Sequence, residues 1–316
     1  MVSRRLLRIK ILQILYAYFK KQENSIEKSE KELFISINKT YELYNYLLLL
    51  IIDLVHFADN KISFGKEKMV PSYNDLHPNT KFIDNKFIKQ LSENKQFNKY
   101  INNTKISWAN YPELIKKMYL ELIGSNFYNN YLNSTDSSYL EDKDFIIKIY
   151  KNVIANSEDL YQTLEEQCIY WNDDIEFVIS MIIKTIKNFN EEFNENYQLF
   201  DLYKNEEDIE FTKTLFRKTI IHHDENRQLI EKYAKNWDIE RIAFVDILIM
   251  ELALVEITEI SSVPIKVSFN EYIEIAKYYS TDKSSNFING ILDKIIKLLK
   301  QDNKVKKIGR GLIGEA

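Results

Sequence analysis

The sequence predicts an all-α fold, and two observations carry that prediction. The 316 residues include only six glycines and four prolines, far below the usual ~7% and ~5%, whereas a sheet protein of this length needs many tight turns rich in such residues. Apolar side chains also recur at the three- and four-residue spacing of an amphipathic helix, first in Leu7, Ile11, Ile14, Leu15 and Tyr18. With 45% apolar and 28% charged residues, the chain can bury a core, which excludes global disorder.

The expected helices follow one another with short polar breaks. In chain order they cover residues 3–20, 25–62, 84–100, 111–132, 139–155, 157–170 and 173–193. The stretch 63–81 contains Gly65, Pro71 and Pro78 and predicts a loop. Pro112 begins one of the helices, in a first turn that tolerates proline.

The last third of the chain predicts four further helices, over 207–236, 238–259, 268–279 and from 282 onward. Pro264 separates the second from the third. Ser268 and Glu271 match a capping box, in which each side chain satisfies a backbone N–H at the start of a helix. Gly290 lies inside the last helical pattern and costs about 1 kcal/mol relative to Ala there, so we expect close packing against a neighbouring helix.

Charge is distributed unevenly along a chain of net charge −4. Residues 1–21 carry six basic side chains and no acid, residues 294–316 carry seven basic against two acidic, and residues 157–210 carry fifteen acids against three lysines. Such segregation indicates two kinds of contact surface, although a solvated basic tail is an equally good interpretation of the C-terminus. No apolar run approaches the ~20 residues that span a bilayer, and the single Cys168 fits a reducing compartment. We therefore expect a cytoplasmic protein.

The sequence offers little support for an enzyme or a metal protein. His222 and His223 point about 100° apart on a helix and lack a third ligand nearby. The acidic pairs suit solvated faces or helix starts, no glycine-rich phosphate loop is present, and Cys168 has no evident histidine partner. We expect no catalytic residue, no metal and no cofactor.

The N-terminal arginines are the strongest functional signal. On a helix Arg4, Arg8 and Arg5 fall at about 0°, 40° and 100°, so they form one patch. Basic charge in a first turn opposes the helix dipole, so local stability does not explain it. Tyr16 and Phe19 follow on the same face, and arginine with aromatic rings is suited to single-stranded nucleic acid. A solvated basic helix start over an ordinary core stripe remains the alternative.

Several spaced motifs resemble the NusB family of transcription antitermination factors. The first is the arginine-rich start with Gln13-Ile14-Leu15-Tyr16 behind it. The others are Val245-Asp246 with Glu256, Val263-Pro264-Ile265-Lys266-Val267, Asn270-Glu271, Glu274-Ile275-Ala276-Lys277, and Ser284 followed by Phe287-Ile288-Asn289-Gly290-Ile291-Leu292-Asp293-Lys294. The resemblance covers about residues 1–20 and 206–300.

The resemblance implies two small helical bundles that bind boxA-type single-stranded RNA together with the small-subunit ribosomal protein NusE. That complex joins RNA polymerase in antitermination on ribosomal RNA operons. By position, the RNA-binding residues would be Arg4, Arg5, Arg8, Tyr279, Lys283, Ser284 and Phe287, with the arginines on phosphates and the two rings stacking on bases. Tyr16 and Asp246 would lie toward the ribosomal protein. Lys283, Glu251 and Ser280 depart from the family pattern.

We accordingly expect an N-terminal helical region over residues 1–205, a NusB-like core over 206–303 and a basic tail over 304–316. Within the N-terminal region, residues 21–205 form a helical expansion of unassigned role. The alternative function is a helical adaptor that binds only proteins, with the acidic stretch 157–210 as its working surface. A fusion to an RNA methyltransferase finds no support, since no methyl-donor loop follows the core.

Overall fold

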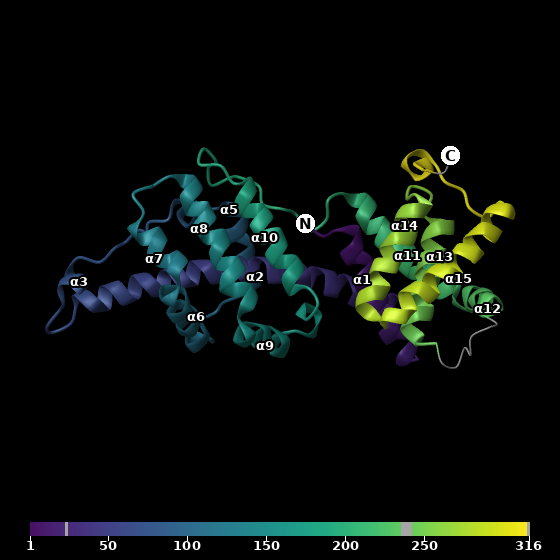
Figure 1. Cartoon of the computed structure of the whole chain (residues 1–316), viewed down its shortest axis with the longest axis horizontal. Helices are drawn as coiled ribbons and strands as arrows, with labels where there is room; N and C mark the ends of the chain where they lie inside the picture. The colour runs from purple at the N-terminus through teal and green to yellow at the C-terminus, as the bar shows by residue number, and fades with distance from the viewer. Residues whose placement is uncertain (23–24, 235–241, 315–316) are drawn as a thin grey trace. The chain divides into compact units, whose positions relative to one another are not determined.

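The computed structural model describes residues 1–22, 25–234 and 242–314, with the side chains of 282 and 283 outside that set. The regular elements in these ranges are all helical, which confirms the all-α prediction. The chain forms two compact units, one of Met1–Ile37 with Leu202–Ala316 and one of Asn38–Asp201 (Figure 1). The expected N-terminal region, residues 1–205, is therefore divided between them, because the first helix packs on helices from the end of the chain.

The first unit is built around one largely buried helix, α13 (Phe244–Glu259). Its helices are α1 (Arg4–Lys20), α11 (Glu206–Ile221), α12 (His223–Tyr233), α13 (Phe244–Glu259), α14 (Ile265–Tyr279) and α15 (Asp282–Gln301). Twelve of the sixteen residues of α13 are buried, as expected for a helix that is apolar on all sides. The other helices of this unit surround α13 and contact it (Figure 1).

Four expectations for this unit need correction or fall outside the described residues. The pattern over 207–236 is two helices that part at His222, and the expected boundaries at Asn236 and Asp238 lie outside the described residues. The expected capping box is wrong: α14 already begins after Pro264, which leaves Ser268 in the helix interior. Close packing at Gly290 is wrong too, because a Cβ there would meet nothing within 4 Å.

The second unit consists of shorter helices around the long α2. Its helices are α2 (Ile26–Lys66, which begins in the first unit), α3 (Tyr73–Leu76), α4 (Lys86–Ser92), α5 (Lys95–Thr104), α6 (Pro112–Gly124), α7 (Asn126–Asn133), α8 (Tyr139–Asn152), α9 (Glu158–Gln167) and α10 (Ile175–Asn188). Two helices that the pattern predicts to be continuous are interrupted. At the breaks Asn94 and Ser125 cap the next helix, accepting hydrogen bonds from Phe97 N at 2.9 Å and from Tyr128 N at 3.2 Å.

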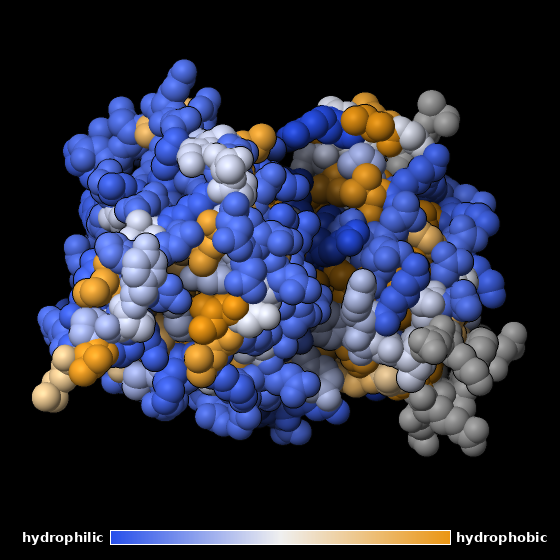
Figure 2. All heavy atoms as spheres, turned by 60° about the vertical axis from the view of Figure 1, so that its left-hand side comes forward, coloured by the Kyte–Doolittle hydropathy of each residue, from blue (hydrophilic) through white to orange (hydrophobic). Residues whose placement is uncertain are grey.

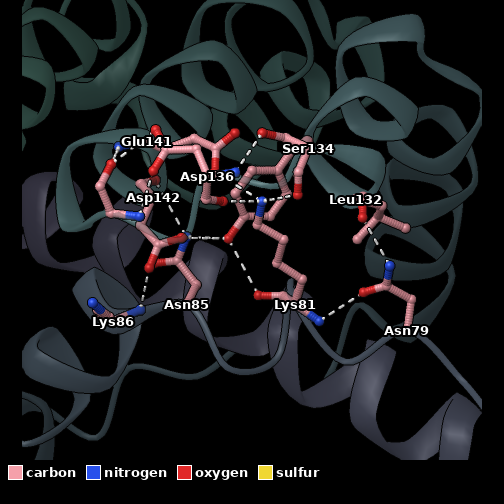
Figure 3. A network of polar contacts seen from close by, with 11 residues as sticks. Asn79, Lys81, Asn85, Lys86, Leu132, Ser134, Asp136, Glu141 and Asp142 are labelled. Atoms are coloured by element: carbon pink, nitrogen blue, oxygen red, sulfur yellow. Dashed lines mark hydrogen bonds and ion pairs between the residues drawn. The ribbon is translucent and has the colours of Figure 1, made fainter.

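A half-buried lysine ties a loop of the second unit to its helices (Figure 3). The Lys81 ammonium donates to the carbonyls of Ser134 and Asp136 at 3.1 and 2.6 Å and to Glu141 Oε2 at 2.7 Å. It also lies 4.6 Å from the centre of the Tyr131 ring. Three oxygens and a ring face therefore compensate the charge of a side chain that is 16% exposed.

The surface of the second unit is mostly hydrophilic, with separate apolar patches (Figure 2). Exposed apolar side chains gather at the end of α2 and around α3: Phe64, Met69, Val70, Tyr73 and Leu76. None of the helices in the described part of the chain combines the length and the apolar character that crossing a membrane requires.

Candidate nucleic-acid interface

The N-terminal helix presents its arginines to other helices of the first unit. Ser3 begins α1, because its Oγ accepts a hydrogen bond from Leu6 N at 3.2 Å. Arg4, Arg5 and Arg8 follow in the first turns, with no acid among the first residues to offset the helix dipole. Each arginine forms an ion pair with a carboxylate on another helix. These ion pairs therefore connect α1 to other helices and do not lie within α1.

Arg8 is buried and anchors α1 to the core. Its side chain is 3% exposed, and its Nε and Nη2 donate to Glu256 at 2.7 and 2.5 Å. Ser268 Oγ and Tyr272 Oη donate to the same carboxylate at 2.7 and 2.8 Å. Burial lowers the pKa of Arg8, but hydrogen bonds and charge from Glu256 outweigh it, and the net effect is a raised pKa. The structure thus turns this guanidinium inward, away from the solvent-facing patch that the helical spacing predicts.

Arg5 stays at the surface. Its Nε and Nη2 donate to the two oxygens of Glu271 on α14 at 2.9 and 2.7 Å, while half of the side chain remains exposed. The hydrogen bond from Arg5 is the main cause of the lowered pKa of Glu271. A guanidinium has five N–H donors in a planar fork, so two bonds to a carboxylate leave others for a phosphate.

Arg4 faces the acidic start of α11. Its Nε donates to Asp208 at 3.0 Å, and its Nη2 lies 3.7 Å from Glu207. The guanidinium also lies 5.0 Å from the centre of the Phe211 ring, a distance at which a cation is attracted to a ring face. Arg4 is less exposed than Arg5, at 29% of its side chain.

Side-chain contacts at two places join α1 to α14. Gln13 lies eight residues after Arg5 on α1, and Tyr279 lies eight residues after Glu271 on α14; Gln13 Nε2 donates to Tyr279 Oη at 3.4 Å. Because the spacing is the same on both helices, the two helices run in the same direction. At 1.5 Å per residue the two contacts are about 12 Å apart. The two helices are therefore joined at two places, with an arginine at one and an aromatic ring at the other.

The turn from α14 to α15 holds the remaining residues of the expected RNA site. Tyr279 ends α14 and is half-buried, as is Phe287 one turn into α15. Ser284 is buried, and its Oγ lies 2.8 Å from Thr281 Oγ1. The side chain of Lys283 lies outside the described residues. Sequence reasoning overlooked Tyr278, whose ring is 83% exposed at the same turn; a run of two tyrosines at a helix end was the available signal.

The two residues expected to face the ribosomal partner lie near the other end of α1. Tyr16 is 43% exposed, and its ring centre is 5.8 Å from that of Phe244. Lys20 Nζ lies 4.9 Å from the centre of the Phe244 ring. Asp246 is buried in the first turn of α13, with no hydrogen-bond partner for its Oδ1 among the described residues. Only Tyr16 of the two thus offers a surface to a partner.

The histidine pair separates instead of converging. His223 Nδ1 lies 2.8 Å from Glu251 Oε2, and its ring stacks on Phe19 at 4.1 Å. His222 Nδ1 lies 3.3 Å from Glu225. Burial raises the pKa of Glu251, with His223 opposing the shift. In the described part of the chain, no cluster of three or more potential ligands has the geometry to hold a metal ion.

Comparisons with known proteins agree with the resemblance in the motifs. The sequence profile of the NusB family matches residues 174–297. Three relatives, each named transcription antitermination protein NusB, come from Salinibacter ruber (45% identical over 105 residues), Chloroherpeton thalassium (50% over 84) and Finegoldia magna (42% over 93). Each name describes a protein of transcription antitermination.

The matches cover only some of each chain. They take in 33%, 27% and 29% of the present chain, and 66%, 40% and 68% of the respective relatives. Less than two thirds of the first two relatives is therefore spanned. No solved structure matches significantly. Given the identity to the Finegoldia magna protein across 68% of its length, the chain belongs to the NusB family.

Proposed function

We propose that this protein is a transcription antitermination factor that binds boxA-type single-stranded RNA together with the ribosomal protein NusE. In this proposal it acts within the RNA polymerase antitermination complex, on ribosomal RNA operons. The names of its relatives support the antitermination role. The pair α1 and α14, joined at Arg5 and at Tyr279, is the observation that carries RNA binding.

The proposal gives the arginines two different tasks. Arg4 and Arg5 contact phosphates with the N–H groups that their carboxylates leave open. Arg8, buried on Glu256, holds α1 against α13 and α14 so that the other two are correctly placed. This division refines the expectation of three equivalent phosphate contacts.

The turn between α14 and α15 supplies the base contacts. Tyr279 and Phe287 stack on bases, a contribution of about 1–3 kcal/mol per base in comparable complexes. The proposal also assigns RNA contacts to Ser284 and Lys283. Tyr16 contacts the ribosomal protein, while Asp246 supports that contact from beneath the surface.

The test is RNA binding by the full chain with Arg4 and Arg5 each replaced by Ala. If each neutralises one phosphate, log affinity falls with log salt at a slope of about −1.4, which is about sevenfold between 50 and 200 mM. The double variant should flatten that slope. Arg227→Ala is a matched control, since Arg227 is also an exposed arginine paired with one glutamate, Glu231 at 3.1 Å.

One observation favours the alternative of an adaptor that binds only proteins. All three arginines already have carboxylate partners, so the patch is less basic than its sequence suggests. A wild-type chain that binds NusE but shows no RNA binding, with or without NusE, would establish the adaptor in place of the RNA-binding factor. RNA binding with unchanged affinity and slope in the double variant would instead show that Arg4 and Arg5 are not the phosphate contacts.

A further inference from the structure

The basic C-terminal tail docks on the first unit next to Arg4. Ile308 N donates to Ser261 O at 3.1 Å. Gly311 is buried against the same carbonyl, and a Cβ there would lie 2.0 Å from Ser261 O, so only glycine fits. Two contacts with one backbone carbonyl thus fix the tail in place.

A lysine adds a third attachment. Lys307 Nζ donates to Ile260 O at 2.8 Å and lies 3.4 Å from Glu256 O. These carbonyls belong to the last turn and end of α13, where the helix dipole favours a cation. The tail is thus anchored at Lys307, Ile308 and Gly311, while most of its other described residues are exposed to solvent.

In the docked tail, Arg310 pairs with Glu207, a carboxylate that also lies near Arg4. Arg310 Nη2 donates to Glu207 at 3.2 Å, whereas Arg4 Nη2 lies 3.7 Å from the same oxygen. Glu207 is thus closer to the tail than to Arg4. Arg310 is 73% exposed, and ion pairs at such sites contribute little to stability, so stability does not account for its position.

The carboxylates around Arg4 would otherwise oppose a phosphate. A cavity of about 540 Å³ is lined by both arginines and by four carboxylates, those of Glu206, Glu207, Glu210 and Glu259. A phosphate that approaches Arg4 meets this negative charge at separations inside the ~8–10 Å Debye length. A cation that takes up one of these carboxylates lowers that repulsion.

We propose that the docked tail keeps Arg4 available to RNA: Arg310 takes Glu207 away from Arg4 and neutralises it, so that the Arg4 guanidinium can bind a phosphate. Arg310 is a positioning residue and does not itself contact RNA. The tail lies beyond the family match, which ends at residue 297. The inference rests on the proposed RNA-binding function.

A double-mutant cycle between Arg310 and Glu207 tests it, with the full chain and a single-stranded oligouridine as the probe. Arg310→Ala should weaken binding about two- to fourfold at low salt, as expected for one charge about 5–10 Å from a phosphate in water. The loss should shrink as salt rises. Arg310→Lys should restore most of the binding, because it keeps the charge.

The decisive variant combines Arg310→Ala with Glu207→Gln. With Glu207 neutral, no carboxylate charge remains at this position to repel the phosphate. The double variant should therefore bind RNA at least as tightly as the wild-type chain. Gly311→Ala, which displaces the tail with all charges kept, should behave like Arg310→Ala. Gly124→Ala is its matched control, because a Cβ at Gly124 meets nothing within 4 Å.

Each outcome separates the inference from the function on which it rests. If Glu207→Gln does not restore the RNA binding that Arg310→Ala loses, Arg310 contacts RNA directly, and its proposed role of neutralising Glu207 is overturned. If Arg310→Ala leaves RNA binding unchanged while Arg4→Ala weakens it, the tail has no role in binding and only the inference fails. If neither Arg4→Ala nor Arg5→Ala matters, the proposed function itself fails.

Discussion

Each unit holds a cation largely away from solvent, but the two units compensate its charge in different ways. In the first unit Arg8 bonds to a carboxylate that is itself fully buried and also receives hydrogen bonds from Ser268 and Tyr272. In the second unit Lys81 bonds to two backbone carbonyls and to the partly exposed Glu141. The first arrangement joins three helices, one of them far from the others in sequence, whereas the second fastens one loop.

The difference matters because the two cations leave different groups behind when they are removed. Loss of Arg8 would leave the Glu256 charge without a cation in the core, and an uncompensated buried charge is among the most destabilising defects known. Loss of Lys81 would leave carbonyls that water can reach. The network of Arg8 and Glu256 is therefore required for the fold of the first unit, whereas the network of Lys81 stabilises one loop.

The largest expected effect follows from removing Arg8. Arg8→Ala should lower the free energy of unfolding by about 3–5 kcal/mol, the cost of breaking a buried ion pair. Urea unfolding followed by circular dichroism measures it. Arg8→Met together with Glu256→Gln removes both charges but keeps an acceptor for the two hydroxyls, so it should recover most of the loss. A loss below about 1 kcal/mol for Arg8→Ala is typical of an exposed ion pair. It would contradict the claim that the fold requires the Arg8–Glu256 network more than the Lys81 network.

A smaller loss is expected in the second unit. Lys81→Met keeps the aliphatic stem over Tyr131 but removes the three hydrogen bonds of the ammonium, and it should cost about 1–2 kcal/mol. The control is Lys116→Met, which removes an exposed lysine paired with Glu113 three residues earlier and should have almost no effect. If Lys81→Met matched the loss of Arg8→Ala, the two networks would be equivalent and the distinction would fail.

The smallest effect concerns the exposed pair of Arg5 and Glu271 and depends on pH. The pKa of Glu271 is lowered from 4.5, so its contribution to stability is present above pH 4.5 and is lost as the pH falls through the lowered value. Because half of the Arg5 side chain is exposed, screening limits this contribution to about 0.5 kcal/mol. Arg5→Ala should therefore be slightly less stable than the wild type at pH 7 and equally stable in strong acid. A difference that persists at low pH would show that Arg5 stabilises the fold by packing.

Much of the first unit could be predicted from sequence because its signals are local. The apolar run of α13 and the spacing in α1 each specify a helix without reference to the rest of the chain. The prediction of a capping box at Ser268 was wrong because α14 begins at Ile265, directly after Pro264, and the serine hydroxyl donates a hydrogen bond to Glu256 on α13. Local signals in the sequence show that a helix is present more reliably than they show at which residue it begins.

The burial of Arg8 could not be predicted from its own surroundings. Its partner lies 248 residues later in the chain, and helical spacing places Arg8 in a patch with two arginines that do reach the surface. One signal was present in Glu256, one of the carboxylates within the mostly apolar pattern of α13, since a buried carboxylate is stabilised by a buried cation. The helix breaks at Asn94 and Ser125 were missed because the polar stretches around them, residues 92–96 and 124–126, are short and the apolar spacing resumes directly after each.

The most direct test of the RNA surface is photocrosslinking of the full chain to a single-stranded RNA that contains 4-thiouridine, with the crosslinked peptides located by mass spectrometry. We expect crosslinks on α1 and at the turn between α14 and α15, with Tyr279 and Phe287 among the modified residues, and fewer crosslinks for the variant lacking Arg4 and Arg5. Crosslinks confined to the second unit, residues 38–201, and insensitive to that variant would contradict the proposed RNA surface.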